Sequence, residues 1–263
     1  MDGPVDAPRD GPVVDILMYH SISEAGGPTS IPPVVFREQM GALADSGMPV
    51  VSLDDLREAR AGGRSLPPRS VVVTFDDAFA DFAETAWPSL EAHGFAPVVF
   101  VPTGHVGGAE GWRGAASPAR RLMGWPTIRA LAAAGVRFGS HSVSHPDLAR
   151  LAPDRLDEEL RASRATLEDR LGTAVEHFAP PYGLTTPSVR RRIAAHYQSS
   201  VGTRLGRAGP DEDIFDLPRL EMFYFTAPGR WQRHLAGRGA AYLRARRLLR
   251  GVRGLLRKPW DRR

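Results

Sequence analysis

The chain has 263 residues, 42% of them hydrophobic, which is enough for a sizeable core in one or two domains. It contains no cysteine, so disulfide bonds and thiolate metal sites are excluded. Its formal net charge is +4, but no helix-turn-helix, zinc-finger or RNA-binding signature accompanies the excess, so nucleic acid is not an expected partner.

Residues 1–12 are rich in acidic residues, proline and glycine, and we expect them to form a flexible segment. They lack the basic start and the apolar stretch of a secretory signal. No apolar run in the chain approaches the roughly 18 residues that span a membrane. On this pattern we expect a cytoplasmic protein.

Short apolar runs, rich in β-branched residues and bounded by turn residues, recur along the chain. Their apolar residues run together rather than alternate, as in strands that are covered on both faces. We expect strands at Val14–Tyr19, Pro49–Leu53, Ser70–Phe75, Pro97–Val101, Val136–Ser140 and Glu176–Ala179.

Helical patterns lie between these runs, and each is followed by a glycine where a left-handed C-cap belongs. We expect helices at Val34–Ser46, Ala78–His93, Pro126–Ala134 and Pro153–Leu171. The alternation of strand and helix predicts a parallel α/β sheet, either a closed barrel or a doubly wound sheet. The chain has no GxGxxG or P-loop motif, which disfavours a nucleotide-binding version.

Two further segments have an unusual composition. Gly104–Pro118 is rich in glycine and is predicted to form a long surface loop that could cover a site. Arg230–Arg263 carries many arginines and almost no acids, which predicts a basic helical tail. Such a tail is either a solvated helix face or a surface attracted to anionic lipid or glycan.

Two adjacent carboxylates, Asp76 and Asp77, follow the strand that ends at Phe75. Such a pair is costly unless positive charge lies beside it. The carboxyl ends of parallel strands are also where active sites are built. The competing interpretation is that one aspartate caps a helix beginning at Ala78. Capping accounts for one of the two aspartates and leaves the other unexplained.

Two imidazoles, His141 and His145, lie four residues apart just after another strand. Pro146 and the flanking serines favour a turn, in which both rings can face one point. Either histidine alone would more often be an ordinary hydrogen-bonded side chain. Together with a carboxylate they make two His and one Asp, which leave positions open for water and substrate, as in catalytic metal sites.

The segment Phe178–Gly183 (FAPPYG) ends a third strand and cannot continue as a helix. Its two prolines stiffen the chain, and Gly183 permits an unusual backbone angle. A rigid turn of this kind can aim a backbone N–H at developing negative charge. A plain loop would have the same composition.

Together, Thr74–Asp77 (TFDD), His141–His145 (HSVSH) and FAPPYG resemble, in order and spacing, the motifs of the NodB-homology polysaccharide deacetylases, carbohydrate esterase family four. Glu159–Gly172 (ELRASRATLEDRLG) is also similar to that family. Ile16–Ser21 (ILMYHS) looks like the branch that includes bacterial poly-N-acetylglucosamine deacetylases.

The resemblance covers roughly residues 16–220. It implies an α/β fold, a single-domain distorted (β/α)7-type barrel, which we place at residues 13–228. The basic tail would then occupy residues 229–263.

Carried over residue by residue, the resemblance makes Asp76 the catalytic base and Asp77 the carboxylate ligand of a metal. It makes His141 and His145 the two imidazole ligands. The backbone N–H of Tyr182 would stabilise the oxyanion. The implied cofactor is one divalent ion, with zinc preferred and iron, cobalt or nickel compatible with the same ligands.

The chain departs from the family pattern in three places. Ala78 replaces the glycine that usually follows the aspartate pair, and Ala179 replaces an arginine that usually contacts the base. We expect Arg219 to take over that contact. The late histidine that supplies the acid in many members is not recognisable, so we expect His20 to be the acid, with His234 as the competitor.

The resemblance implies hydrolysis of N-acetyl groups on amino-sugar residues of a glycan or glycolipid. The charge of the basic tail, which lies outside the matched region, separately predicts peripheral contact with anionic membrane. One alternative keeps the metal site but acts as a deformylase or amidase on a lipid-linked sugar or another small amide. The other is a catalytically inactive carbohydrate-binding homologue, against which the intact Asp76, Asp77, His141 and His145 argue.

Overall fold

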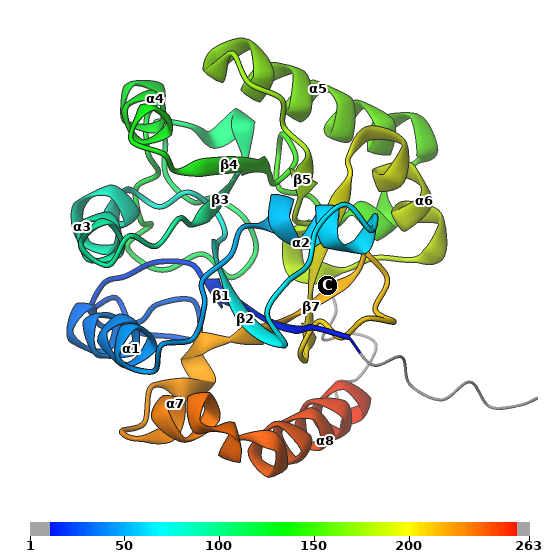
Figure 1. The fold of residues 1–263 in the computed structure, drawn as a ribbon. Coiled ribbons are helices and arrows are strands. Elements are labelled where there is room, and N and C mark those ends of the chain that lie inside the picture. Colours follow the sequence, from blue (N-terminus) through cyan, green and yellow to red (C-terminus); the bar gives the residue numbers. More distant parts are fainter. Residues whose placement is uncertain (1–10, 257–263) are drawn as a thin grey trace, which may run out of the picture.

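The computed structural model describes residues 11–256 and the side chains of residues 11–251. The first ten residues of the expected flexible segment and residues 257–263 of the tail lie outside this range. Seven parallel strands close into a barrel in the order in which they occur along the chain (Figure 1). The strands are β1 (Val13–Tyr19), β2 (Arg69–Phe75), β3 (Val98–Val101), β4 (Arg137–Ser140), β5 (His177–Phe178), β6 (Ser199–Leu205) and β7 (Leu217–Glu221).

Helices surround the barrel, so that the expected single-domain barrel is confirmed and the doubly wound sheet is excluded (Figure 1). The helices are α1 (Pro33–Asp45), α2 (Leu53–Arg60), α3 (Trp87–Ala92), α4 (Trp125–Ala133), α5 (Pro153–Leu171), α6 (Pro187–His196), α7 (Arg230–Arg233) and α8 (Ala240–Leu256). None of the helices between residues 11 and 256 is long and apolar enough to cross a membrane.

One expected strand is wrong. Pro49–Leu53 forms only an isolated bridge between Val50 and Val71, and the chain then turns into α2. The Ser52 hydroxyl accepts from Asp55 N–H, and the Asp55 carboxylate accepts from Ser52 N–H, at 3.0 and 2.9 Å. This capping box starts the helix where the apolar run ends.

A second expectation is only partly correct. Ala78–His93 is not one helix, because Ala78 has φ of 57° and the regular part begins with a π-helical turn at Phe82–Ala86 that leads into α3. The sequence did not predict α6, β6 or β7. β6 (SSVGTRL) and β7 (LPRLE) contain polar residues, glycine and proline, so their apolar runs are too short to stand out.

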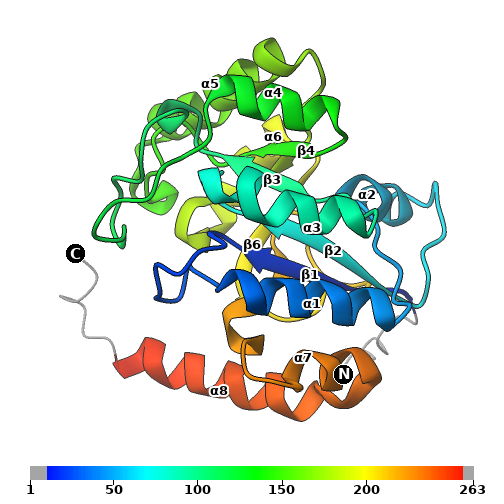
Figure 2. The same ribbon diagram turned by 90° about the vertical axis from the view of Figure 1, so that its left-hand side faces the viewer.

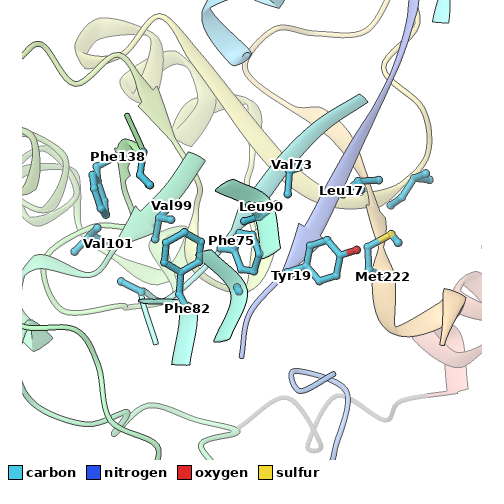
Figure 3. Packing of buried hydrophobic residues seen from close by; sticks show 14 of the residues in the cluster. Leu17, Tyr19, Val73, Phe75, Phe82, Leu90, Val99, Val101, Phe138 and Met222 are labelled. Carbon is cyan, nitrogen blue, oxygen red and sulfur yellow. The ribbon is translucent and has the colours of Figure 1, made fainter. Parts of the chain in front are cut away.

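The core has two apolar clusters that reflect the alternation of side chains along the strands. The smaller cluster takes one residue set from the strands, such as Ile16 and Val72, and is closed by Leu53 and Leu56 of α2. The larger cluster takes the opposite set and packs it under the helices. Figure 3 shows part of this larger cluster, in which the rings of Tyr19 and Phe75 stack with 5.2 Å between their centroids.

The basic segment after β7 packs against the barrel through α7 and the start of α8 (Figure 2). Trp231 is 2% exposed, and its indole N–H donates to the carbonyl of Gln39 on α1 at 3.1 Å. His234 lies 2.9 Å from the buried carboxylate of Asp15 on β1. The beginning of this segment is therefore a structural part of the domain.

We expect Trp231→Ala to lower the free energy of unfolding by about 3–5 kcal/mol, because it removes a large, fully packed side chain. Urea unfolding followed by circular dichroism measures the change. The matched control is Leu248→Ala on α8, where the side chain is 72% exposed and the change should stay within about 0.5 kcal/mol. Equal small effects at both positions would show that α7 does not contribute to the core.

Candidate metal and catalytic site

The carboxyl ends of four strands bring the three motifs and His20 to one cavity. The cavity has a volume of about 370 Å³, which lies in the lower part of the range for small-molecule sites. Asp76, Asp77, His141, His145, Tyr182 and His20 all line it. The expectation that parallel strand ends gather these residues is therefore confirmed.

Asp77, His141 and His145 form a group whose ligand-type atoms all lie within 4.8 Å of one another. Oδ1 of Asp77 is 3.4 Å from Nε2 of His141 and 3.2 Å from Nε2 of His145. All three side chains are buried, with at most 6% of their surface exposed. One carboxylate and two imidazoles, with room for other ligands, are the donor set of a catalytic divalent-metal site.

The hydrogen bonds around this group suit a metal. Nδ1 of His141 lies 2.6 Å from the carbonyl oxygen of Ala179, which acts as its acceptor and leaves the lone pair of Nε2 directed at the group. Oδ1 of Asp77 is buried and has no hydrogen-bond partner within residues 11–251. A buried carboxylate oxygen without a donor calls for a cation.

The charges of the group respond to one another. Burial raises the pKa of Asp77, but His141 and His145 outweigh burial and hold that pKa below its usual value. Burial lowers the pKa of His145. Burial also acts to lower the pKa of His141, but the nearby Asp77 and Asp76 outweigh it, so the pKa of His141 is raised. His145 is thus kept neutral, which is the form that binds a metal.

The backbone at the site is unusual. Five non-glycine residues in the described chain have positive φ, and all belong to the three motifs or follow directly: Asp77, Ala78, Ser142, His145 and Tyr182, with φ between 55° and 73°. Left-handed backbone costs roughly 1–2 kcal/mol for such residues. Strain of this kind is typical of functional sites. The left-handed backbone of Ala78 also excludes the interpretation that an aspartate caps a helix beginning there, because the helical turn starts only at Phe82.

A glutamate on α5 holds the turn between the two histidines. Oε2 of Glu159 accepts from the backbone N–H groups of Val143 and Ser144 at 2.8 and 2.9 Å. Its Oε1 accepts from the Ser144 hydroxyl at 2.7 Å. Glu159 is 5% exposed, so these bonds are protected from water. Sequence reasoning missed this residue, although it opens the stretch ELRASRATLEDRLG that resembles the family.

Asp76 is bound by Arg219, as the loss of arginine at position 179 suggested. The guanidinium of Arg219 makes two bonds of 2.7 Å to the two carboxylate oxygens of Asp76. It also donates to Thr74 Oγ1 at 3.1 Å and to the Gly202 carbonyl at 2.8 Å. Burial raises the pKa of Asp76, but Arg219 outweighs burial and holds that pKa below its ordinary value. Asp76 therefore stays ionised.

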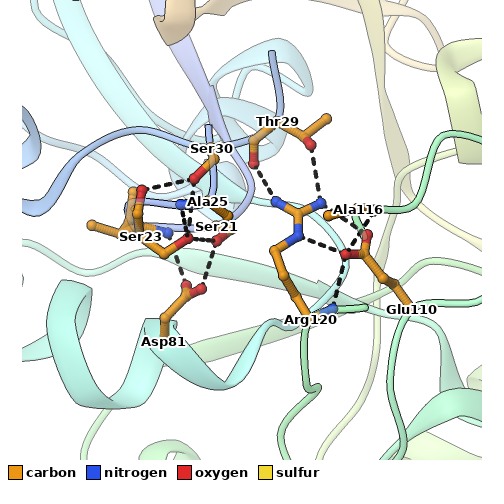
Figure 4. Close-up of polar contacts among 10 residues, drawn as sticks. Ser21, Ser23, Ala25, Thr29, Ser30, Asp81, Glu110, Ala116 and Arg120 are labelled. Carbon is orange, nitrogen blue, oxygen red and sulfur yellow. Dashed lines mark hydrogen bonds and ion pairs between the residues drawn. The ribbon is translucent and has the colours of Figure 1, made fainter. Parts of the chain in front are cut away.

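His20 lies at the rim of the site, with Nε2 3.9 Å from Oδ2 of Asp76 and 15% of its side chain exposed. The loop after it is anchored by Asp81, which accepts from the Ser21 hydroxyl at 2.6 Å and from Ile22 N–H at 2.8 Å (Figure 4). His234 does not line this cavity, because it is paired with Asp15 on β1 beneath α7. Of the two candidate acids, only His20 faces the site.

The predicted loop Gly104–Pro118 does cover the site. Trp112 stacks on His145 with 4.2 Å between the ring centroids. Glu110 fixes the loop by bonding to Arg120, which in turn donates to Thr29 on the neighbouring loop (Figure 4). The ring of Tyr182 also packs against His145, edge to face, with 4.8 Å between the ring centroids.

The sharp turn at Tyr182 depends on the glycine after it. Gly183 has φ of 66°, and a Cβ there would lie 2.1 Å from Oγ1 of Thr203. Both the backbone angle and the close approach of Thr203 favour glycine here, and the unusual angle that the sequence indicated at Gly183 is confirmed. The same turn places Tyr182 in the wall of the cavity.

The model of the polysaccharide deacetylase family matches residues 63–199, just over half of the chain and the part that carries all three motifs. The chain belongs to the polysaccharide deacetylase family. YxkH of Bacillus subtilis strain 168, a protein named after the same family, is 24% identical over 208 residues, covering 79% of this chain and 70% of YxkH.

Two solved structures and one enzyme extend the comparison. The Streptococcus pyogenes deacetylase PplD in complex with acetate superposes with a TM-score of 0.70 at 25% identity, covering 80% of this chain and 92% of PplD. IcaB from Ammonifex degensii has the same fold, with a TM-score of 0.73 at 24% identity over 89% of this chain and 100% of IcaB. The poly-β-1,6-N-acetyl-D-glucosamine N-deacetylase of Escherichia coli K12 is 33% identical over 91 residues, 34% of this chain and 13% of that enzyme.

The structure has a second group of ligand-type side chains, at the opposite end of the barrel: Asp54, Glu176 and His177. His177 Nε2 lies 2.9 Å from Asp54, which Arg137 also contacts at 2.8 Å. Arg57 lies 3.6 Å from Glu176. Each carboxylate thus already has a cationic or imidazole partner, so the group is an ion-pair network between α2 and the strand beginnings.

Proposed function

We propose that the protein is a metal-dependent hydrolase that removes N-acetyl groups from amino-sugar residues of a glycan or glycoconjugate. The observation that carries the proposal is a buried Asp77–His141–His145 group beside an ionised Asp76, in a cavity of sugar size. The partial match to the E. coli enzyme further supports a poly-N-acetylglucosamine-like substrate.

In this proposal, Asp77, His141 and His145 hold one divalent ion, with zinc preferred and iron, cobalt or nickel also accommodated by these donors. Such an ion, when bound, lowers the pKa of a water molecule and polarises the acetyl carbonyl. Family membership and the set of donor atoms support the binding of a divalent ion, and we propose zinc as that ion.

The chain's own residues then carry the proton transfers. Asp76, held ionised by Arg219, accepts a proton from the attacking water. The backbone N–H of Tyr182 donates to the carbonyl oxygen as negative charge develops, a contribution of about 3–4 kcal/mol. His20 gives a proton to the nitrogen of the sugar, so that the C–N bond breaks and a neutral amine leaves.

Acetate release from a panel of N-acetylated glycans by the purified, metal-loaded protein tests the proposal. Acetate should appear with wild type and fall away with the metal removed. Release of formate from N-formylated sugars without acetate would favour the deformylase alternative. Binding of glycans with no release of either acid would favour the inactive carbohydrate-binding homologue.

We expect His20→Ala to retain the metal and to lose about 10²–10⁴-fold in turnover on an N-acetyl amide, because the amine leaves poorly without a proton donor. The loss should be smaller on an activated acetyl ester, whose leaving group needs little protonation. The comparison of the two substrates is the measurement, and His93→Ala on the exposed surface is the control. Equal losses on amide and ester would rule out the acid role.

We also propose that α8 brings the protein to anionic membranes. Leu248 and Leu249 are 72% and 61% exposed on a helix that is otherwise rich in arginine. A basic amphipathic helix with exposed leucines binds lipid interfaces by apolar burial and by attraction to anionic headgroups.

Leu248→Ser combined with Leu249→Ser should reduce sedimentation of the protein with vesicles that contain phosphatidylserine. Wild-type binding should also weaken at high salt, because ions screen the attraction between the helix and the lipid. Binding that neither the double substitution nor salt changes would contradict the membrane proposal.

A further inference from the structure

A second hollow adjoins the catalytic cavity on the side of α8. The two share Thr203 and Arg250, which line both. Figure 2 shows α8 running along the barrel with its later part towards the end where the loop after β3 lies. The basic segment thus contributes a side chain to the wall of the catalytic cavity itself.

The second hollow carries a surplus of positive charge. Four arginines line it, and two of them are neutralised: Arg190 contacts Asp213 at 3.2 Å, and Arg204 bonds to Glu212. The ion pairs around the hollow all involve Arg190 or Arg204, and none between described residues involves Arg247 or Arg250.

One acid lines the hollow together with these two arginines, and a second lines the catalytic cavity together with Arg250. Asp216 lines the hollow, and burial raises its pKa more than Arg204 and Arg190 lower it. Glu221 lines the catalytic cavity, and burial raises its pKa despite the opposing effects of His20 and Arg250. Asp216 lies 3.9 Å from Arg190 and 3.9 Å from Arg204, so its charge is already shared between those two arginines and the guanidinium groups of Arg247 and Arg250 remain available to a ligand.

Arg247 and Arg250 lie three residues apart on α8, so their side chains share one face of the helix. Two guanidinium forks at one place match the three oxygens and the charge of a phosphate better than a single carboxylate. The hydroxyls of Thr185 and Thr203 line the same hollow and can donate further hydrogen bonds. We propose that this hollow is a subsite for a phosphate ester carried by the substrate, next to the N-acetylated sugar.

The subsite rests on the proposed deacetylase function only for its place in the substrate, because phosphate binding can be measured without turnover. The probes are N-acetylglucosamine 1-phosphate and the neutral methyl glycoside of N-acetylglucosamine. Each is titrated by calorimetry into metal-loaded wild type, Arg247→Gln, Arg250→Gln and the control Arg244→Gln, which changes an exposed arginine of α8 outside both hollows.

Wild type should bind the sugar phosphate about tenfold more tightly than the neutral glycoside, as expected for charge-assisted hydrogen bonds at a partly exposed site. The preference should largely disappear in Arg247→Gln and Arg250→Gln and persist in Arg244→Gln. A preference that survives the first two substitutions would come from phosphate on the metal and would overturn the subsite. Absence of any preference in wild type would also overturn it.

Two further arms separate related explanations. Vesicles of phosphatidylserine test whether the phosphate belongs to a lipid headgroup. If vesicle binding depends on Arg247 and the sugar phosphate is not preferred, the hollow does not bind a phosphate ester of the substrate. Acetate release is followed in the same samples. If neither sugar releases acetate while the phosphate preference and its loss in Arg247→Gln are observed, the deacetylase proposal fails and the subsite stands.

Discussion

Asp76→Asn should retain the metal and lose about 10²–10⁴-fold in turnover, because the amide cannot accept the proton of the attacking water. The geometry makes this substitution informative: Asp76 is bound by Arg219 through both oxygens, whereas the neighbouring Asp77 faces the two histidines. Metal content and the rate of acetate release are measured on the same preparation.

The substitution also leaves Arg219, which is 1% exposed, without its carboxylate partner. Losing one member of a buried ion pair typically costs about 3–5 kcal/mol, so the unfolding of the variant must be measured beside its activity. A folded variant with full metal content and little turnover supports the base role. A variant that loses metal but regains turnover when reloaded would show that the roles of Asp76 and Asp77 are reversed.

His145→Ala should abolish tight metal binding, and His141→Ala should do the same. Each removes one of three protein donors whose ligand atoms lie within 4.8 Å of one another. Metal analysis after dialysis against a weak chelator measures the effect. His93→Ala, an exposed histidine at the end of α3, is the control that should keep the metal. Equal metal content in all the variants would exclude this group as the binding site.

The sequence predicts the residues of the site that directly follow a strand, because all parallel strands of a barrel end on the same side. Asp76 and Asp77 follow β2, and His141 follows β4, so the closed parallel barrel necessarily brings them to one end. The contact between Arg219 and Asp76 was expected from the missing arginine at position 179. The two residues are 143 positions apart, and only the fold shows that both carboxylate oxygens are bound.

The parts that could not be predicted depend on distant contacts or on the backbone. Glu159 is an ordinary helical residue in the sequence, and its three bonds to the turn at Val143 and Ser144 appear only when α5 packs beside β4. The Pro49–Leu53 run has the composition of a strand, but the capping box at Ser52 determines a helix. The apolar composition favours a strand, but the capping hydrogen bonds between Ser52 and Asp55 stabilise the helix that begins there.

The cluster of left-handed residues at the site has a consequence for how this protein can gain heat resistance. Strain of roughly 1–2 kcal/mol at each such residue is large beside the 5–15 kcal/mol by which domains are usually stable. Glycine would relieve this strain at Ala78, with φ of 57°, but the other four left-handed residues carry motif side chains that glycine would remove. Thermal adaptation should therefore accumulate in the outer helices and surface loops, while the motif turns stay costly.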